Sequence, residues 1–288
     1  MTTAAPSADA HERALRDESA RAAAQAQHTI DSAAWNVFAN HQPYYHVLSD
    51  PQMLNPGQSA RDVFWATGTR DVKALMDFAE LSPTGGTGVD FGCGLGRLTR
   101  GLIPFTERQV GLDISPVMIA KARELSSFPS MDFLPISPEG WPLDSASASL
   151  VISLLVFSHL STVELMEQSL RELARVLRPG GFAVFGIQTM TSRGAIATWL
   201  QQVARHGRTD RAPNAEQIRR KLVALHRGEQ PEFSEQEILD DMFGMEFRRL
   251  KSISVRRLRR VLRMSRLDIR RMTRDRSDGS TRVAVQKA

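Results

Sequence analysis

The fold is decided by residues 89–98, which read Val-Asp-Phe-Gly-Cys-Gly-Leu-Gly-Arg-Leu. The first three residues are typical of a short buried strand, and the residues from Arg97 onward have helical spacing. Between them Gly92, Gly94 and Gly96 stand at alternate positions, and glycine lets the backbone approach a ligand closely. The stretch therefore predicts a strand, a tight glycine loop and a helix, with a ligand held at the loop.

The same strand and helix pattern continues along the chain. Residues 109–112 predict a strand before a helix at 116–125, residues 150–157 predict a strand before a helix at 162–177, and residues 181–187 predict a further strand. Strands that alternate with helices of ten to fifteen residues indicate an α/β fold with a doubly wound, mostly parallel sheet.

Two acidic residues accompany the loop. Asp113 ends the second predicted strand, at about the 20-residue separation from the first strand at which a carboxylate binds ribose hydroxyls. Asp90 lies in an apolar strand end, where a buried carboxylate needs a donor such as a ligand ammonium. Arg97 stands where the dinucleotide fingerprint needs glycine, which disfavours a nicotinamide oxidoreductase.

These motifs closely resemble those of the class I (Rossmann-like) S-adenosylmethionine-dependent methyltransferases, over about residues 61–192 and 235–288. The glycine loop resembles their first motif and residues 110–119 the acidic second one, while residues 141–143 and 173–182 resemble two later landmarks. The resemblance implies a seven-stranded sheet whose last strand is antiparallel. It places the last two strands at 245–253 and 281–286.

The resemblance also implies a cofactor site for S-adenosylmethionine. The glycines would face the methionine part of the cofactor, Asp90 its amino group, Asp113 its ribose, and Ile114 and Met118 its adenine. Ser137 and Pro138 stand where the family often has an aspartate near the adenine. The expected cofactor site comprises Asp90, Gly92, Cys93, Gly94, Gly96, Arg97, Asp113, Ile114, Met118, Ser137, Pro138 and Leu154, with no metal.

Methyl transfer from a sulfonium mainly requires alignment of donor and acceptor, together with removal of a proton where the acceptor carries one. His159 follows the strand expected to end beside the methyl group, and histidine suits proton transfer near neutral pH. Tyr44, beside Tyr45 and His46, is the second catalytic candidate. A structural hydrogen bond at a helix start would also explain His159, and aromatic packing would also explain Tyr44.

The flanks of the predicted domain differ from it in composition. Residues 1–30 are rich in alanine and predict a partly disordered lead that becomes helical from about His11. Residues 31–84 predict an irregular cap followed by a helix at 62–81. Residues 85–288 form the expected methyltransferase domain, with helical insertions at about 188–230 and 254–278. Further helices are predicted at 235–242 and 255–272.

The charge of the chain does not identify the molecule on which it acts. The net charge is +5, but residues 245–288 carry 15 Lys and Arg against 4 Asp and Glu, so the basic character belongs to one end. The arginines at 256, 257, 259, 260, 263, 266, 270, 271 and 274 fall on or near the predicted basic helix. They could bind phosphate, although arginine outnumbers lysine throughout the chain. We favour a small-molecule acceptor. A nucleic-acid methyltransferase and a non-catalytic cofactor-binding protein remain alternatives.

Location follows from what the sequence lacks. No apolar run approaches the ~20 residues of a membrane span, and the first residues have no signal-peptide pattern. The single cysteine, Cys93, cannot form an internal disulfide. We therefore expect a soluble cytoplasmic protein with no membrane partner.

Overall fold

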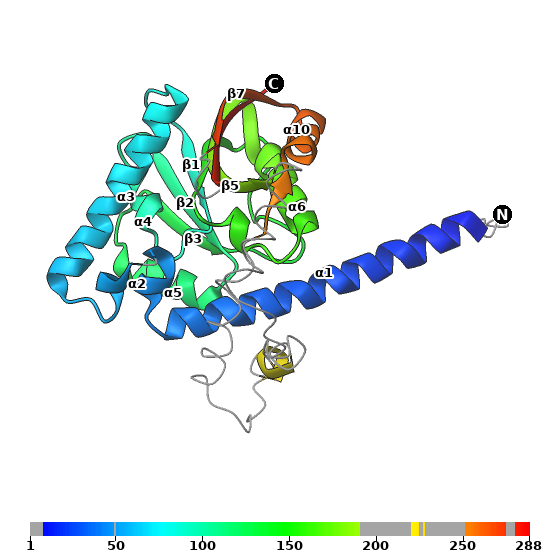
Figure 1. Ribbon diagram of the computed structural model, residues 1–288, viewed down its shortest axis with the longest axis horizontal. Coiled ribbons are helices and arrows are strands. Elements are labelled where there is room, and N and C mark those ends of the chain that lie inside the picture. Colours follow the sequence, from blue (N-terminus) through cyan, green and yellow to red (C-terminus); the bar gives the residue numbers. More distant parts are fainter. Residues whose placement is uncertain (1–7, 49, 191–219, 225–226, 228–250, 275–279) are drawn as a thin grey trace, which may run out of the picture.

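The computed structural model describes residues 8–48, 50–190, 220–224, 227, 251–274 and 280–288. Within them one eight-stranded sheet organises the chain, with the order β3-β2-β1-β4-β5-β8-β7 and β6 paired to β5 (Figure 1). The strands are β1 Thr87–Phe91, β2 Arg108–Asp113, β3 Met131–Pro135, β4 Ala148–Ser153, β5 Leu177–Met190, β6 Ile253–Ser254, β7 Leu267–Arg274 and β8 Ser280–Lys287. Strands β1 to β6 pair in parallel, and β8 is antiparallel to both neighbours. The predicted doubly wound sheet and its antiparallel last strand are confirmed.

Helices cover both faces of this sheet (Figure 1). On one face α3 Gln58–Ala79 and α4 Arg97–Gly101 pack on Leu150, Ile152 and Val184. On the other face α6 Val163–Val176 and α10 Val255–Met264 pack on the alternate strand residues, such as Val151 and Phe185. α5 Pro116–Leu125 follows β2 and packs on Cys93 and Phe133. Because the strands are buried on both faces, they read in the sequence as continuous apolar runs.

The N-terminal part is more helical than predicted. α1 runs unbroken over Ala8–Asn40, and α2 Pro43–Leu48 and the short 3-10 helix Pro51–Met53 follow it. The expected boundary at residue 30 and the irregular cap after it were therefore wrong. Alanine is the strongest helix former, which favours a helix in the first part of this segment. The last turns of α1 bury Val37, Phe38 and Ala39, and this burial stabilises the helix as far as its end. α1 crosses the lower edge of the domain, and its N-terminal half extends beyond it (Figure 1).

The C-terminal part corrects a second prediction. α10 ends at Met264, and residues 267–274 form the edge strand β7 where a helix to 272 was predicted. β7 also takes the place beside the last strand that was predicted for 245–253. Residues 245–250 of that prediction lie outside the described residues, and Ile253 belongs to β6. The turn between α10 and β7 uses Arg266 at φ 55°, so no glycine or proline marks it. The last strand was placed correctly, at β8.

Several predictions fall on residues that are not described. The helix at 235–242 and most of the insertion at 188–230 lie there, although 220–224 is helical and 188–190 belongs to β5. Among the helices of the described ranges, none combines the length and the apolar character that crossing a bilayer requires.

Candidate active site

The glycine loop joins β1 to α4 at the carboxyl edge of the sheet. Gly92 and Gly94 have φ values of 77° and 52°, a region that side chains with a Cβ rarely adopt. A Cβ on Gly92 would collide with Val156, and one on Gly94 would lie 2.7 Å from Cγ2 of Val47 in α2. The loop therefore needs glycine both for its backbone conformation and for the close approach of α2 and the β4 end.

Asp113 closes the loop from the end of β2. Its Oδ2 accepts a hydrogen bond from the Gly94 amide at 2.9 Å, and its Oδ1 accepts one from the Ser115 amide at 2.9 Å. The side chain is buried, and burial raises the pKa of its carboxyl despite these hydrogen bonds. Since a carboxylate oxygen can accept more than one hydrogen bond, Asp113 can hold the loop and still bind hydroxyl groups.

Asp90 and Arg97 lie deeper than predicted. Oδ2 of Asp90 accepts a hydrogen bond from Thr99 Oγ1 at 2.7 Å, and its Oδ1 is buried without a described partner. Burial raises the pKa of Asp90 to about 6. The guanidinium of Arg97 is 2.6 Å from Asp71 Oδ2 of α3 and is almost fully buried. Asp90 thus connects β1 to α4, and Arg97 connects α4 to α3. A protein hydroxyl supplies a donor to one oxygen of Asp90, where the sequence predicted a ligand ammonium.

A pocket opens above this loop, and residues from the glycine loop, the ends of β2 and β4, and α1 line it. Concave sites of this kind, lined by apolar side chains with a few polar groups, are where small molecules commonly bind. The pocket is lined by residues of the predicted cofactor site, namely Gly92, Cys93, Gly94, Arg97, Asp113, Ile114, Met118, Ser137, Pro138 and Leu154. Other lining residues include Ala24, His28, Asp31, Trp35, Leu155, His159, Leu160 and Leu165.

Helix α1 closes the pocket along one side. Ser32 Oγ donates to the Ile114 carbonyl at 3.0 Å, and His28 Nε2 donates to the Ile136 carbonyl at 3.0 Å. Asn36 Oδ1 accepts a hydrogen bond from Ser115 Oγ at 2.6 Å. These bonds attach α1 to the segments after β2 and β3, which border the expected adenine position. The N-terminal helix is therefore part of the pocket wall.

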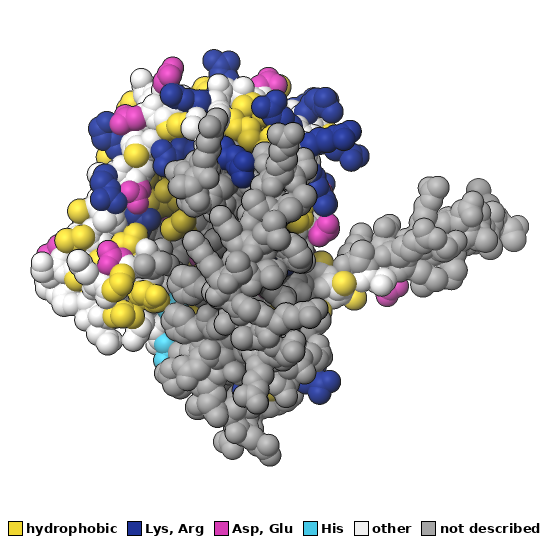
Figure 2. Space-filling view, in the orientation of Figure 1, with side chains coloured by type: hydrophobic (Ala, Val, Ile, Leu, Met, Phe, Trp, Pro, Cys, Tyr) yellow, Lys and Arg dark blue, Asp and Glu magenta, His cyan; other side chains and the backbone are white. Residues whose placement is uncertain are grey.

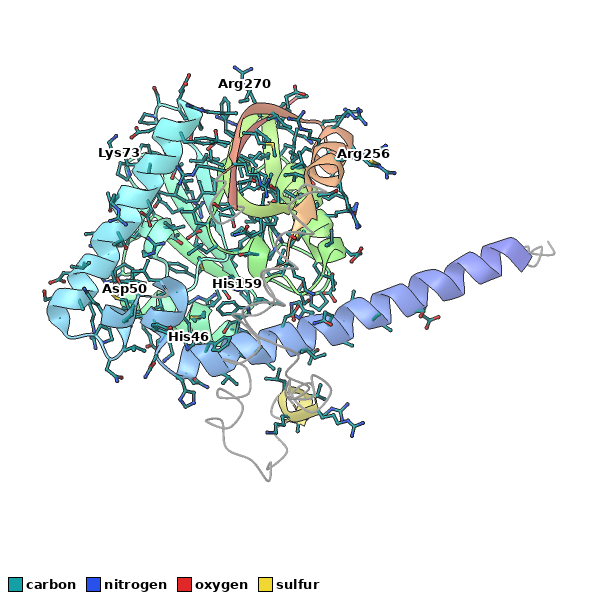
Figure 3. All side chains as sticks on the ribbon, in the orientation of Figure 1. His46, Asp50, Lys73, His159, Arg256 and Arg270 are labelled. Carbon is teal, nitrogen blue, oxygen red and sulfur yellow. The ribbon has the colours of Figure 1, made fainter. Side chains whose placement is uncertain are left out.

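The opposite wall comes from the end of β4 and the 3-10 helix Phe157–His159. Leu155 adopts φ 62° and is 56% exposed, so a large apolar side chain stands in a strained conformation at the pocket mouth. The rings of His159 and Trp35 meet edge to face at 5.8 Å. Burial lowers the pKa of His159, which keeps its imidazole neutral at pH 7. Figure 3 shows His159 and His46 beside the part of α1 that crosses the domain.

Most of the predicted site residues meet in this pocket. Eleven line it: Gly92, Cys93, Gly94, Arg97, Asp113, Ile114, Met118, Ser137, Pro138, Leu154 and His159. Three others, Asp90, Gly96 and Tyr44, are not among its described lining residues. Gly96 precedes α4 with φ 86°. Tyr44 packs edge to face on Phe64 at 4.9 Å, with Arg61 over its ring. Its position supports a packing role and no catalytic one.

The α1 residues of the pocket were missed from the sequence. Ala24, His28, Asp31 and Trp35 line it, and their spacing of four, three and four positions puts them on one face of a helix. The turn-forming residues of 31–59 predict an irregular segment, and this prediction obscures the helical spacing. A helical interpretation of 24–35 would have found this face.

Comparisons with known proteins agree with the geometry. Residues 89–185 match the protein family described as "Methyltransferase domain". The dimethylglycine N-methyltransferase of Parasynechococcus marenigrum (strain WH8102) is 36% identical over 121 residues, which are 40% of this chain and 42% of the relative. The tRNA (carboxymethyluridine(34)-5-O)-methyltransferase ALKBH8 of Mus musculus is 32% identical over 118 residues, 40% of this chain and 17% of the relative. The chain thus matches less than half the length of these curated relatives.

Among solved structures, a candidate methyltransferase of Bacillus halodurans C-125 superposes with a TM-score of 0.50 at 12% identity, over 76% of this chain and 99% of the other. That likeness concerns the fold, and the family match covers the glycine loop, the acidic strand end and the β4 and β5 region. The chain therefore carries a match to a methyltransferase domain at residues 89–185, within a sheet of the Rossmann-like type.

Proposed function

We propose that the chain transfers a methyl group from S-adenosylmethionine to a small molecule bound between α1 and the end of β4. One observation carries this proposal: the glycine loop, Asp113 and the acceptor wall with His159 all line the same pocket. A pocket shared by both halves allows donor and acceptor to be aligned, and alignment of this kind is worth ~7 to 11 kcal/mol.

The residues present fit this cofactor. Gly92 and Gly94 line the pocket, so backbone atoms without a side chain face the ligand there. Asp113 provides buried acceptor oxygens for two sugar hydroxyls, while Ile114 and Met118 are apolar walls for a flat base. Ser137 offers a hydroxyl in place of the aspartate that the family often has. These contacts are proposals for an aminoacyl nucleoside, with Asp90 acting behind the loop.

When bound, S-adenosylmethionine supplies a methyl group already activated by its sulfonium. The protein then has to hold the acceptor in line and exclude water. Trp35 of α1, together with Leu155 and Leu160 from the opposite wall, would surround the acceptor with apolar side chains. His159, neutral because burial lowers its pKa, could accept a proton from the acceptor. We assign no catalytic role to Tyr44.

The test is cofactor binding by Asp113→Asn, measured by calorimetry. The amide keeps the side-chain volume but loses the charge and one acceptor oxygen, so we expect affinity for S-adenosylmethionine to fall by about 10-fold or more. Asp132→Asn is the matched control, because Asp132 is exposed and pairs with Arg108 on the surface. Equal affinities for wild type and Asp113→Asn would refute the assigned cofactor site.

A nucleic-acid acceptor is the second candidate, and two observations favour it. A relative named above acts on tRNA, and α10 exposes Arg256, Arg259, Arg260 and Arg263, for which no ion pair is found within the described residues. Figure 2 shows Lys and Arg side chains gathered over this upper part of the molecule. Arg256 is well separated from His159 in Figure 3, which favours the small molecule.

RNA binding distinguishes the two candidates. Neutralising several phosphates with arginine makes binding strongly salt-dependent. If RNA is the acceptor, labelled tRNA should bind with an affinity that falls steeply between 50 and 200 mM salt, and replacing the four arginines with glutamine should flatten that slope. We expect no such salt-dependent binding and no methylated RNA by mass detection.

A further inference from the structure

We propose that Asp31 is the anchor of the methyl acceptor, and that the acceptor is a small amine bound as its ammonium. The inference rests on the proposed function and names its substrate class. It comes from the geometry of α1, which brings one carboxylate into the acceptor side of the pocket. No motif in the sequence singled out this residue.

The Asp31 carboxylate is held in place from two directions. Its Oδ1 accepts a hydrogen bond from Gln27 Nε2 at 2.9 Å, one turn earlier in α1. Its Oδ2 accepts one from Ser161 Oγ at 2.8 Å, across the pocket mouth. Each oxygen retains capacity for a further donor. The side chain is thus oriented before a ligand arrives, which reduces the entropy lost on binding.

Asp31 differs from the other charged side chains that line the pocket in the described residues. Arg97 pairs with Asp71 at 2.6 Å, and Glu172 pairs with Arg175 at 2.8 Å. Asp113 accepts two backbone amides on the cofactor side. Asp31 accepts hydrogen bonds only from neutral groups in this set. Within the described residues Asp31 therefore has no Lys or Arg partner; burial raises the pKa of its carboxyl, and the nearby His28 lowers it.

The surroundings of Asp31 favour a cation over other ligands. A carboxylate in a largely apolar pocket is costly unless a cation compensates it, and a ligand ammonium does so with a charge-assisted hydrogen bond. Trp35, one turn further along α1, adds an aromatic ring, which attracts cations at its face. His46 and His159 are neutral, because burial lowers the pKa of His46 to about 4 and also lowers that of His159. An anionic acceptor would meet no unpaired positive charge among the described lining residues.

The proposed methyl transfer balances in protons and electrons with Asp31, His159 and the sulfonium as the participating groups. The ammonium held by Asp31 gives one proton to the neutral imidazole of His159, which frees the nitrogen lone pair. The lone pair forms the new bond from nitrogen to the methyl carbon as the bond from that carbon to sulfur breaks, and the breaking bond leaves its electron pair on sulfur. The product is a methylated ammonium, and His159 returns its proton to solvent.

Three probes that differ in their head group test the preference: 2-phenylethylamine, 2-phenylethanol and phenylacetate. Calorimetry measures their binding to the full chain saturated with S-adenosylhomocysteine. We expect the amine to bind wild type most tightly. Asp31→Asn keeps the shape and can still accept from Ser161, so we expect it to lose the amine affinity by about 10-fold or more and to bind the alcohol unchanged. Asp31→Glu, which keeps the charge, should retain the preference for the amine.

Ser161→Ala is the matched control, since it removes the bond between α1 and the loop while leaving the carboxylate. If Asp31 served only to fasten α1, Ser161→Ala would weaken all three probes alike, while Asp31→Asn, which keeps the bond to Ser161, would bind the amine as tightly as wild type; that result would overturn the inference. It also fails if wild type binds the amine no better than the alcohol or the acid. Failure of S-adenosylhomocysteine to bind at all would instead refute the proposed function, so the two failures are distinguishable.

Discussion

The close approach of Val47 to Gly94 can be tested by measuring the free energy of unfolding of variants. We consider Gly94→Ala, which adds one methyl group to the glycine loop. Gly94 has φ 52°, and an alanine held in this region costs about 1 to 2 kcal/mol. The added Cβ would also lie 2.7 Å from Val47 Cγ2, and overpacking of this kind costs about 1 to 3 kcal/mol more. The expected loss in the free energy of unfolding is therefore about 2 to 5 kcal/mol.

Gly180→Ala separates the two contributions. Gly180 has φ 76°, and a Cβ placed there would have no atom within 4 Å. This variant should lose only the backbone part, about 1 to 2 kcal/mol. In the double variant Val47→Ala with Gly94→Ala, the collision is relieved while the backbone strain persists, so a double-mutant cycle should show a coupling of about 1 kcal/mol or more.

Denaturant unfolding followed by circular dichroism gives the free energy of unfolding of Gly94→Ala, Gly180→Ala, Val47→Ala and the double variant. The comparison requires that the dependence of this free energy on denaturant concentration is the same for all of them. The reasoning is refuted if Gly94→Ala lowers the free energy of unfolding no more than Gly180→Ala does. It is also refuted if the double variant loses the sum of the losses of Gly94→Ala and Val47→Ala. Either result would mean that α2 does not press on the glycine loop. Calorimetry on the same samples should show that S-adenosylmethionine affinity falls for Gly94→Ala and stays unchanged for Gly180→Ala.

Three further predictions concern charged or titrating side chains. His159→Ala should slow turnover while leaving cofactor affinity intact, and a variant that turns over at the wild-type rate would remove His159 as the base. Arg97→Ala should lower the free energy of unfolding by about 2 kcal/mol, because it removes the buried charge-assisted hydrogen bond to Asp71, which among the described residues keeps only its pair with Arg70. Arg108→Ala, from an exposed pair, should cost under about 1 kcal/mol; equal losses in chemical unfolding would contradict this. Burial raises the pKa of Asp90 from 3.8 to about 6, so the folded state binds a proton there that the unfolded state releases between these values. The stability of wild type relative to Asp90→Asn should therefore rise, by up to about 3 kcal/mol, as the pH falls from about 7 to 4, and a difference independent of pH would exclude the shift.

The cofactor side of the site was predictable because its requirements are local in the sequence. A close backbone approach needs glycines in a short loop, and a ribose ligand needs a carboxylate at the next strand end. Both leave a pattern at fixed spacing, and Gly92, Gly94 and Asp113 line one pocket in the structure; their contacts with a cofactor stay a prediction. The depth of Asp90 and Arg97 was not predictable, since it depends on Thr99 and on Asp71 of another helix.

The C-terminal strands show a different limit. Residues 267–274 carry apolar side chains at 267, 269 and 272 among exposed arginines, and such spacing suits an edge strand as well as a continued helix. Antiparallel pairing with β8 determines the outcome, and Arg266 makes the turn without a glycine. Tertiary pairing therefore overrides a local pattern that has two solutions.

The acceptor side is hidden from motif analysis for a structural reason. Its wall is one face of α1, which lies more than a hundred residues from His159 and Ser161 along the chain. Helix spacing alone cannot say which partner that face will meet, because an apolar or mixed face is equally typical of ordinary packing. The position of α1 follows from its hydrogen bonds to the carbonyls of Ile114 and Ile136, and these segments belong to the cofactor side. The same helix thus connects the two sides of the pocket, so under the proposed function substitutions on this face of α1 should change the acceptor preference of this chain without altering the glycine loop.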